Sequence, residues 1–170
     1  MNKTVRVALV ALLCIGAAAC SKKEVKPQPP APAPAAQPPA PAPVSNGKYT
    51  PADLDTDACL RQRVVYFDFD KSEIKPEFQQ IIACHAKYLQ DRPTAHIRLE
   101  GNADERGTRE YNLGLGERRG NAVSSALQAA GGSASQLDVI SYGKEKPVCR
   151  EHNEDCWSKN RRVEIVYTAQ

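Results

Sequence analysis

Residues 101–119 read GNADERGTREYNLGLGERR, and they are the most informative stretch of the chain. They follow an alternating segment, residues 96–101 (HIRLEG), and lead into apolar residues at helical spacing. This order predicts a strand end, a charged loop and a helix entry. Four arginines, four glycines and several carboxylates crowd into the stretch. Loops held by rigid elements commonly carry binding residues, so this loop is the first candidate for a functional site.

Periodic patterns on both sides of this stretch predict the remaining secondary structure. Four segments with β-branched, aromatic or alternating residues are predicted as strands: 64–69, 96–101, 137–142 and 162–168. Two segments with an apolar stripe at helical spacing are predicted as helices: 76–90 and 111–130. A short helix is expected over 53–60 and a loop over 143–160. His85 lies on the stripe of the first long helix, and this position favours a packed histidine over a ligand.

The order of these elements indicates an α+β fold in residues 51–170. Strand–helix–strand crossovers make parallel strand pairs and lay helices on the sheet. We therefore expect a two-layer βαβαβ-type sandwich with a mixed four-stranded sheet and helices on one face. About 120 residues are enough for one sizeable hydrophobic core.

Residues 1–19 have the pattern of a secretory signal peptide. Lys3 and Arg6 precede an apolar run over 7–15, and small residues follow it. The run is too short to span a bilayer as a mature helix. Cys20 comes directly after three alanines and resembles the lipobox cysteine of bacterial lipoproteins, which becomes a lipidated N-terminus. The alternative is an ordinary secretory signal with an unmodified Cys20.

Residues 20–50 are expected to be a disordered tether behind that cysteine. Between 26 and 43 the sequence is almost entirely Pro, Ala and Gln, a composition that cannot offset the entropy of folding. Pro-rich chains extend by about 3.1 Å per residue, so the segment could span roughly 90 Å.

The charge balance argues against a nucleic-acid partner. The formal net charge is +3, and removal of Lys3 and Arg6 with the signal leaves 21 basic and 20 acidic residues. No basic field remains that would attract a phosphate backbone.

Four cysteines lie beyond the signal and the lipidation candidate: Cys59, Cys84, Cys149 and Cys156. In an exported protein an even number predicts disulfides, and four cysteines allow three pairings. Proximity in sequence favours Cys149–Cys156, which leaves Cys59–Cys84. A zinc site of Cys149, His152 and Cys156 is the alternative, but it lacks a fourth ligand and paired C-x-x-C spacing. We expect no metal and no cofactor.

The charged side chains of the central stretch suit a zwitterionic ligand. Asp104, Glu105, Arg106, Arg118 and Arg119 converge on one strand end and one helix start. A guanidinium matches a carboxylate bidentately, and the N–H groups at a helix start can bind an anionic oxygen. The alternative is that these groups pair with one another as exposed salt bridges, which contribute about 0–1 kcal/mol each.

Four motifs in fixed order resemble the OmpA-like peptidoglycan-binding domain, and most closely the lipoproteins of the Tol–Pal system. They are VYFDFDKSEI (65–74), EGNADERGTREYNLGLGERRGNAV (100–123), SYGKEKP (141–147) and SKNRRVEIVY (158–167). A cysteine pair before the NRRVE strand is also similar to OmpA, in support of the Cys149–Cys156 pairing. The resemblance covers about 110 residues.

The resemblance implies that the pocket binds the side-chain end of meso-diaminopimelate in the peptide stem of peptidoglycan. Asp104 would contact the ligand's ammonium and Arg119 its carboxylate. Phe69 and Asp70 would line one wall. Further implied contact residues are Arg106, Thr108, Asn112 and Leu115.

Together these features predict an outer-membrane lipoprotein with a periplasmic domain that binds peptidoglycan non-covalently. The resemblance implies a Tol–Pal role in envelope integrity and constriction at cell division, with Tol-system periplasmic proteins as partners. The alternative is an OmpA-like lipoprotein of another envelope or secretion complex. A wall-modifying enzyme is disfavoured, because no Ser-His-Asp set, paired catalytic carboxylates or zinc motif is recognisable in the sequence.

Overall fold

The computed structural model describes residues 47–170. The predicted signal peptide, Cys20 and the predicted tether up to residue 46 lie outside the described residues. In the part that is described, no helix is both long and apolar enough to cross a membrane.

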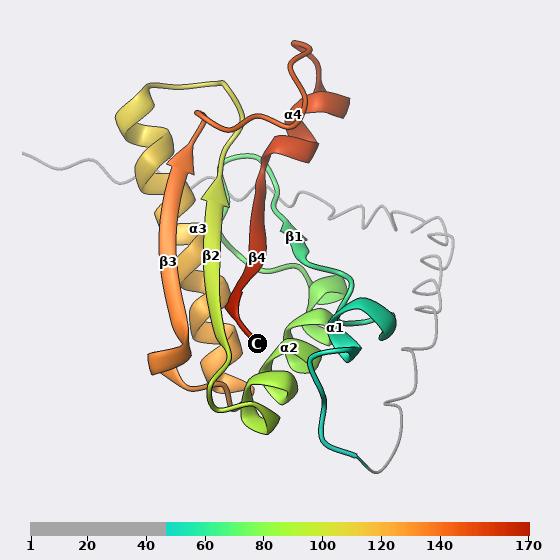
Figure 1. Cartoon of the computed structure of the whole chain (residues 1–170). Helices are drawn as coiled ribbons and strands as arrows, with labels where there is room; N and C mark the ends of the chain where they lie inside the picture. Colours follow the sequence, from blue (N-terminus) through green and yellow to red (C-terminus); the bar gives the residue numbers. More distant parts are fainter. Residues whose placement is uncertain (1–46) are drawn as a thin grey trace, which may run out of the picture. The chain divides into compact units, whose positions relative to one another are not determined.

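Four strands form one mixed sheet in the order β1-β4-β2-β3 (Figure 1). The strands are β1 (Val64–Tyr66), β2 (His96–Asn102), β3 (Leu137–Gly143) and β4 (Arg162–Ala169). β2 and β3 run parallel, and β4 lies between β1 and β2, antiparallel to both. The last strand therefore enters the middle of the sheet and brings the C-terminal segment beside the loop after β1.

The principal helices cover one face of the sheet (Figure 1). The helices are α1 (Asp53–Thr56), α2 (Gln79–Asp91), α3 (Arg109–Ala129) and α4 (Glu154–Asn160), with 3-10 turns at Pro76–Phe78 and Ala134–Gln136. Alternate residues of β2 and β4, including Leu99 and Ile165, are buried in the core with α2 and α3. Residues of the opposite alternation lie on the other face of the sheet, where they form the Arg98–Glu100 and Arg162–Glu164 ion pairs. The predicted α+β class with a mixed four-stranded sheet is confirmed.

The apolar stripe predicted along α2 is buried, and His85 lies within it. The imidazole is 0% exposed, with Nδ1 2.7 Å from the hydroxyl of Tyr167 and Nε2 2.9 Å from the carbonyl oxygen of Gln62. Beside it, Cys84 forms a disulfide with Cys59. Cys149 and Cys156 form the second disulfide, so the structure contains the pairs that sequence proximity favoured.

Two elements near the N-terminal side are shorter than the sequence predicts. The strand expected over 64–69 ends at Tyr66, because the chain then turns away from the ladder towards Asp70, which has a positive φ of 57°. The helix expected over 53–60 ends at Thr56. Asp57 stops it, since its carboxylate accepts the N–H groups of Cys59 and Leu60.

Three other expectations are corrected by local contacts. The loop expected over 143–160 contains α4, whose polar sequence shows no apolar periodicity; Asn153 caps it by accepting the N–H of Cys156. The helix α3 begins at Arg109, two residues early, because Thr108 caps it. The helix predicted to run to residue 130 ends at Ala129, and Ala130 follows the helix end and is exposed.

Glycines let α3 lie directly on the end of β2. A Cβ on Gly101 would stand 1.9 Å from the carbonyl oxygen of Gly116, and one on Gly120 would stand 2.6 Å from Cγ1 of Val139. Neither position can hold a larger side chain without moving the helix. Arg119 lies between Gly116 and Gly120 on α3. The close contact therefore places Arg119 against the end of β2, where the charged loop starts.

Candidate functional site

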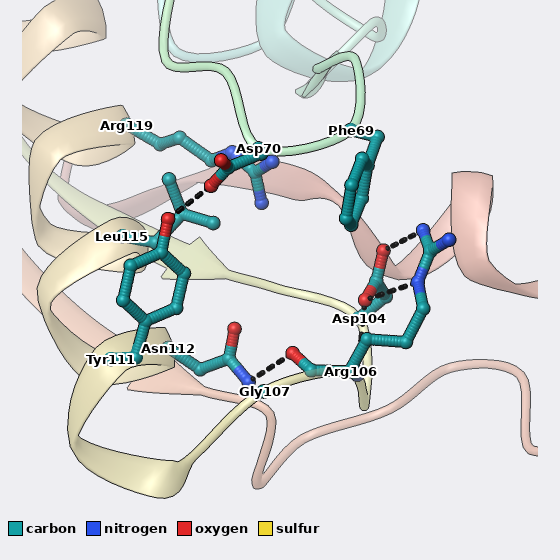
Figure 2. A pocket seen from close by; sticks show the side chains of 9 residues that line it. All are labelled: Phe69, Asp70, Asp104, Arg106, Gly107, Tyr111, Asn112, Leu115 and Arg119. Atoms are coloured by element: carbon teal, nitrogen blue, oxygen red, sulfur yellow. Dashed lines mark hydrogen bonds and ion pairs between the residues drawn. The ribbon is translucent and has the colours of Figure 1, made fainter.

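One pocket lies where the loop after β1, the loop after β2 and the first turns of α3 meet (Figure 2). It encloses a cavity of about 180 Å³. The lining residues are Phe69, Asp70, Asp104, Arg106, Gly107, Tyr111, Asn112, Leu115 and Arg119. Two segments that are some 30 residues apart in sequence thus contribute walls to a single cavity.

Arg119 is fully buried and is held by backbone carbonyl groups. Its Nε donates to the carbonyl of Lys71 at 2.8 Å, Nη1 to that of Asn102 at 2.9 Å and Nη2 to that of Asp68 at 3.0 Å. These carbonyls come from the loop after β1 and the end of β2, so the guanidinium fastens both to α3. Two of its five N–H donors remain after these bonds.

No carboxylate neutralises Arg119 directly. Within residues 47–170, no acidic oxygen lies within the 4.0 Å limit of an ion pair with its guanidinium. Burial, together with the positive charge of Arg161, lowers the pKa of Arg119 to about 10. The side chain therefore stays charged at neutral pH. The carboxylates of Asp104 and Asp70 act on its pKa in the opposite direction to burial, but neither forms a direct ion pair with the guanidinium.

Asp104 carries the opposite charge and is 5% exposed. Its Oδ1 accepts the backbone N–H and the Nε of Arg106, both at 3.1 Å; its Oδ2 accepts Nη2 of Arg106 at 2.6 Å and Nη1 of Arg161 at 3.3 Å. Burial alone would raise the pKa of Asp104, but the hydrogen bonds from Arg106 and Arg161 outweigh it and lower the pKa. The carboxylate is ionised at neutral pH.

Arg106 lies between two aromatic rings at the edge of the pocket. Its guanidinium carbon is 4.0 Å from the ring centroid of Phe69 and 4.2 Å from that of Trp157. Nη2 of Arg106 is also 3.7 Å from Oε2 of Glu154, on α4. The hydrogen bonds to Asp104 raise the pKa of Arg106. The guanidinium thus lies between two rings and bonds to one carboxylate, with a second carboxylate nearby.

The remaining walls are formed by α3 and the tip of the loop after β1. The hydroxyl of Tyr111 donates to the carboxylate of Asp70, a bond that raises the pKa of Tyr111 and joins the two segments (Figure 2). Asn112 is 1% exposed and donates its amide to the carbonyl of Arg106 at 2.9 Å. Leu115 contributes an apolar surface. These contacts hold the acidic and basic walls at a fixed separation.

The structure brings together most of the residues that the sequence singled out for the ligand. Those lining the pocket are Phe69, Asp70, Asp104, Arg106, Asn112, Leu115 and Arg119. Thr108 is not among the lining residues, since its hydroxyl accepts the N–H of Tyr111 and caps α3. That N–H group, part of the expected anion site at the helix start, is therefore already occupied. Arg118 is exposed and also lies off the pocket lining.

Sequence reasoning missed four contributors. Gly107 and Tyr111 line the pocket, Arg161 contacts Asp104, and Trp157 stacks on Arg106. Tyr111 had a signal: it precedes Leu115 by four residues, so both lie on one helix face. Arg161 lies in the 158–167 motif but was not assigned to the ligand, and Trp157 had no signal. Both reach the site through the placement of α4 and β4.

The zinc alternative fails on the chemistry of its ligands. Cys149 and Cys156 are bonded to each other at 2.06 Å, so neither sulfur is available as a thiolate ligand. The Nδ1 of His152 pairs instead with Oε1 of Glu105 at 2.6 Å. In the described part of the chain, no group of three or more His, Cys, Asp or Glu side chains could hold a metal ion.

Comparisons with known proteins agree on the fold and the relationship. The sequence profile of the OmpA family matches residues 66–161. The "Peptidoglycan-associated lipoprotein" of Haemophilus influenzae is 47% identical over 121 residues, which cover 71% of this chain and 76% of that protein. The protein of the same name in Pseudomonas aeruginosa is 45% identical over 122 residues, covering 71% and 72% of the two chains.

Solved structures give the same result. The crystal structure of the peptidoglycan-associated lipoprotein from Burkholderia pseudomallei matches with a TM-score of 0.66 and 45% identity, covering 68% of this chain and 98% of that one. The C-terminal domain of Helicobacter pylori MotB matches with a TM-score of 0.58 and 26% identity, covering 63% and 84%. The family match over residues 66–161 contains every residue that lines the pocket.

Proposed function

This chain belongs to the OmpA family, among its peptidoglycan-associated lipoproteins, and on that premise we propose that its pocket binds the zwitterionic end of meso-diaminopimelate in peptidoglycan. The function is non-covalent attachment to the cell wall, and the family assigns no enzymatic activity.

The observation that supports this proposal most directly is the pair of buried charges in one cavity. Arg119 is charged, fully buried and, in the described part of the chain, bonded only to carbonyl oxygens, while Asp104 is an ionised carboxylate in the same pocket. An unneutralised buried cation is costly, and a ligand carboxylate that takes the two free N–H donors recovers part of that cost. A ligand ammonium is attracted to the acidic side. The side-chain end of meso-diaminopimelate in the peptide stem carries both an ammonium and a carboxylate.

The strength expected of such a site is modest. Charge-assisted hydrogen bonds contribute about 1.5–3 kcal/mol each before the cost of association. A few of them give roughly micromolar affinity, about 8 kcal/mol. A domain that is held close to the wall rebinds quickly at high effective concentration, so an anchored site of this strength is sufficient.

Lipidation of Cys20 and the tether over 20–50 complete the proposal. Both rest on the sequence pattern and on relatives that are named as lipoproteins. A lipid anchor in the outer membrane, followed by an extended Pro-rich segment, would let the domain reach peptidoglycan in the periplasm. The attachment would then link the outer membrane to the wall.

The finer assignment is a Tol–Pal role in envelope integrity and constriction. The 45–47% identity to lipoproteins named for peptidoglycan association, against 26% for the MotB domain, favours it over a motor or secretion complex. Co-purification of a Tol-system periplasmic protein with the full chain from cell envelopes would support this role. Recovery of a different envelope complex in its place would favour the alternative.

Sedimentation with purified peptidoglycan and calorimetric titration of meso-diaminopimelate test the site. We expect Asp104→Asn and Arg119→Lys to weaken both by about tenfold or more, since each removes a charge or a donor fork that faces the ligand. Arg118→Lys is the matched control, because it lies next in the helix, is exposed and is off the pocket. If Asp104→Asn and Arg119→Lys fold, by circular dichroism, and still bind like the parent, the assignment is wrong.

A further inference from the structure

Arg106 occupies the acidic side of the pocket in the free protein. A carboxylate offers about four acceptor positions, and Asp104 already accepts four donors: three from Arg106 and one from Arg161. An incoming ammonium therefore has no open position at Asp104. Binding at this carboxylate requires one of the present donors to leave.

Arg106 is the donor that is free to move. Its side chain is 31% exposed, whereas that of Arg161 is 7% exposed. Arg161 is also bonded to the carbonyl of Phe67 at 3.1 Å and to Glu154 at 2.5 Å. Among residues 47–170, the guanidinium of Arg106 has no bond to a carbonyl oxygen. The two aromatic rings stack on its faces and leave it free to slide parallel to them.

A second carboxylate lies ready to receive Arg106. Oε2 of Glu154 is 3.7 Å from Nη2 of Arg106, while its other oxygen holds Arg161. Glu154 lies in the first turn of α4, and its side chain is 61% exposed. Movement between Asp104 and Glu154 would keep the guanidinium between the rings of Phe69 and Trp157.

We propose that Arg106 is an internal substitute for the ligand's ammonium, and that ligand binding transfers it from Asp104 to Glu154. This inference rests on the proposed function of the pocket. Arg106 then determines specificity: only a ligand with a cationic group can replace it at Asp104. Glu154 is a positioning residue, since it acts on the ligand through Arg106.

The α4 segment is built to hold this second position. The indole N–H of Trp157 donates to Glu105 at 2.7 Å, which fixes the ring against Arg106. Asn160 accepts the N–H groups of Val148 and Cys149, and the Cys149–Cys156 disulfide closes the segment before Trp157. The α4 segment that carries Trp157 and Glu154 is therefore also held by contacts that do not involve Arg106.

Calorimetric titration of meso-diaminopimelate into the purified full chain distinguishes a displaced Arg106 from one that contacts the ligand. Arg106→Gln and Arg106→Ala remove the competitor, so we expect about two- to tenfold tighter binding. Glu154→Gln removes the receiving carboxylate, so we expect about two- to fivefold weaker binding. Asp155→Asn is the matched control, an exposed acid of the same turn for which no bond to Arg106 is present, and should bind like the parent.

The ligand-induced change in Trp157 fluorescence reports on Arg106 separately from the overall stability of the domain. Trp157 is the single tryptophan of the chain, and it stacks on Arg106. We expect meso-diaminopimelate to change its emission in the parent and not in Arg106→Ala. Pimelate, which has the same carbon chain and carboxylates without the ammonium groups, should leave the emission unchanged.

The outcomes separate this inference from the proposed function. No binding of meso-diaminopimelate or peptidoglycan by the parent would reject the function of the pocket. Binding by the parent, with equal or weaker binding by both Arg106 variants, would reject the displacement alone. An equal loss in Glu154→Gln and Asp155→Asn would also reject it, because the effect would then follow from net charge.

Discussion

Two buried residues of opposite charge are stabilised in different ways in this pocket. Asp104 is compensated by arginines, whereas Arg119 is solvated by carbonyl oxygens that do not cancel its charge. Carbonyl dipoles replace lost water without neutralising the ion, so the positive potential persists in the cavity. This difference makes Arg119 the preformed half of the site and leaves Asp104 dependent on exchange of its partners.

Burial also acts on His85 in the core, where the loss of water keeps the imidazole neutral. Its burial lowers the pKa to about 4, from an ordinary value of 6.5. Because the folded state binds fewer protons than the unfolded state between these values, stability is complete above about pH 6.5 and falls as the pH drops towards 4. We expect His85 to account for a loss of about 3 kcal/mol across this window.

Denaturant unfolding from pH 7 to pH 4 measures this contribution. His85→Gln cannot titrate, so the difference between its unfolding free energy and that of the parent should change with pH in that window. His152→Gln should retain the slope of His85, because His152 is exposed and its pKa is raised by Glu105. The same pH dependence in the parent and in His85→Gln would contradict the assignment.

At the scale of elements, the position of α3 on the sheet determines where Arg119 lies. A Cβ on Gly116 would stand 2.3 Å from Oγ of Ser141 and 2.8 Å from the carbonyl oxygen of Gly101. Ser141 itself donates to the carbonyl of Leu113 at 2.6 Å. The helix backbone therefore lies against the strand ends with the small side chain of Ser141 between them, and an added methyl group would push the first turns of α3 outward.

Substitution of two glycines in α3 tests this contact. We expect Gly116→Ala to lower the unfolding free energy by about 1–3 kcal/mol, because it overpacks the contact. Gly114→Ala is the matched change: its Cβ would meet only Nη1 of Arg118, at 3.4 Å. It should raise the unfolding free energy by up to about 1 kcal/mol, through helix propensity. Equal shifts of both variants in urea unfolding would show that α3 does not depend on close contact.

At the scale of the whole molecule, two disulfides serve separate parts of the domain. Cys59–Cys84 joins the segment before β1 to α2 across 25 residues, and both cysteines belong to the core cluster. Cys149–Cys156 spans 7 residues and closes the segment that carries Trp157. One disulfide thus stabilises the core, and the other holds the α4 segment beside the pocket.

Removal of each disulfide should therefore have a different effect. We expect the double variant Cys59→Ser, Cys84→Ser to lose about 3 kcal/mol of unfolding free energy, because its closed loop is long. At temperatures where it is folded, its affinity for meso-diaminopimelate should match that of the parent. The double variant Cys149→Ser, Cys156→Ser should lose about 2 kcal/mol and change the emission of Trp157. Equal effects of the two variants on ligand affinity, measured by calorimetry, would contradict this division.

The sequence by itself indicated which faces of the helices and strands are buried and which segment carries the site. Periodicity of apolar residues predicted α2, α3 and the alternating strands, because it reports which face of an element leaves water. The charged loop after β2 was evident from residues 101–119 alone. Proximity in sequence favoured Cys149–Cys156 and Cys59–Cys84 among three possible pairings, and the structure contains the favoured pairs.

Only the tertiary structure decided which charges are paired. Four arginines lie within residues 101–119, and local sequence did not show that Arg106 neutralises Asp104 while Arg119 bonds to carbonyls. The insertion of β4 between β1 and β2 brings Arg161 to Asp104, 57 residues away, and carries α4 with Trp157 to the pocket edge. Periodicity encodes burial, which is a local property, whereas the partner of a charge depends on contacts between distant segments.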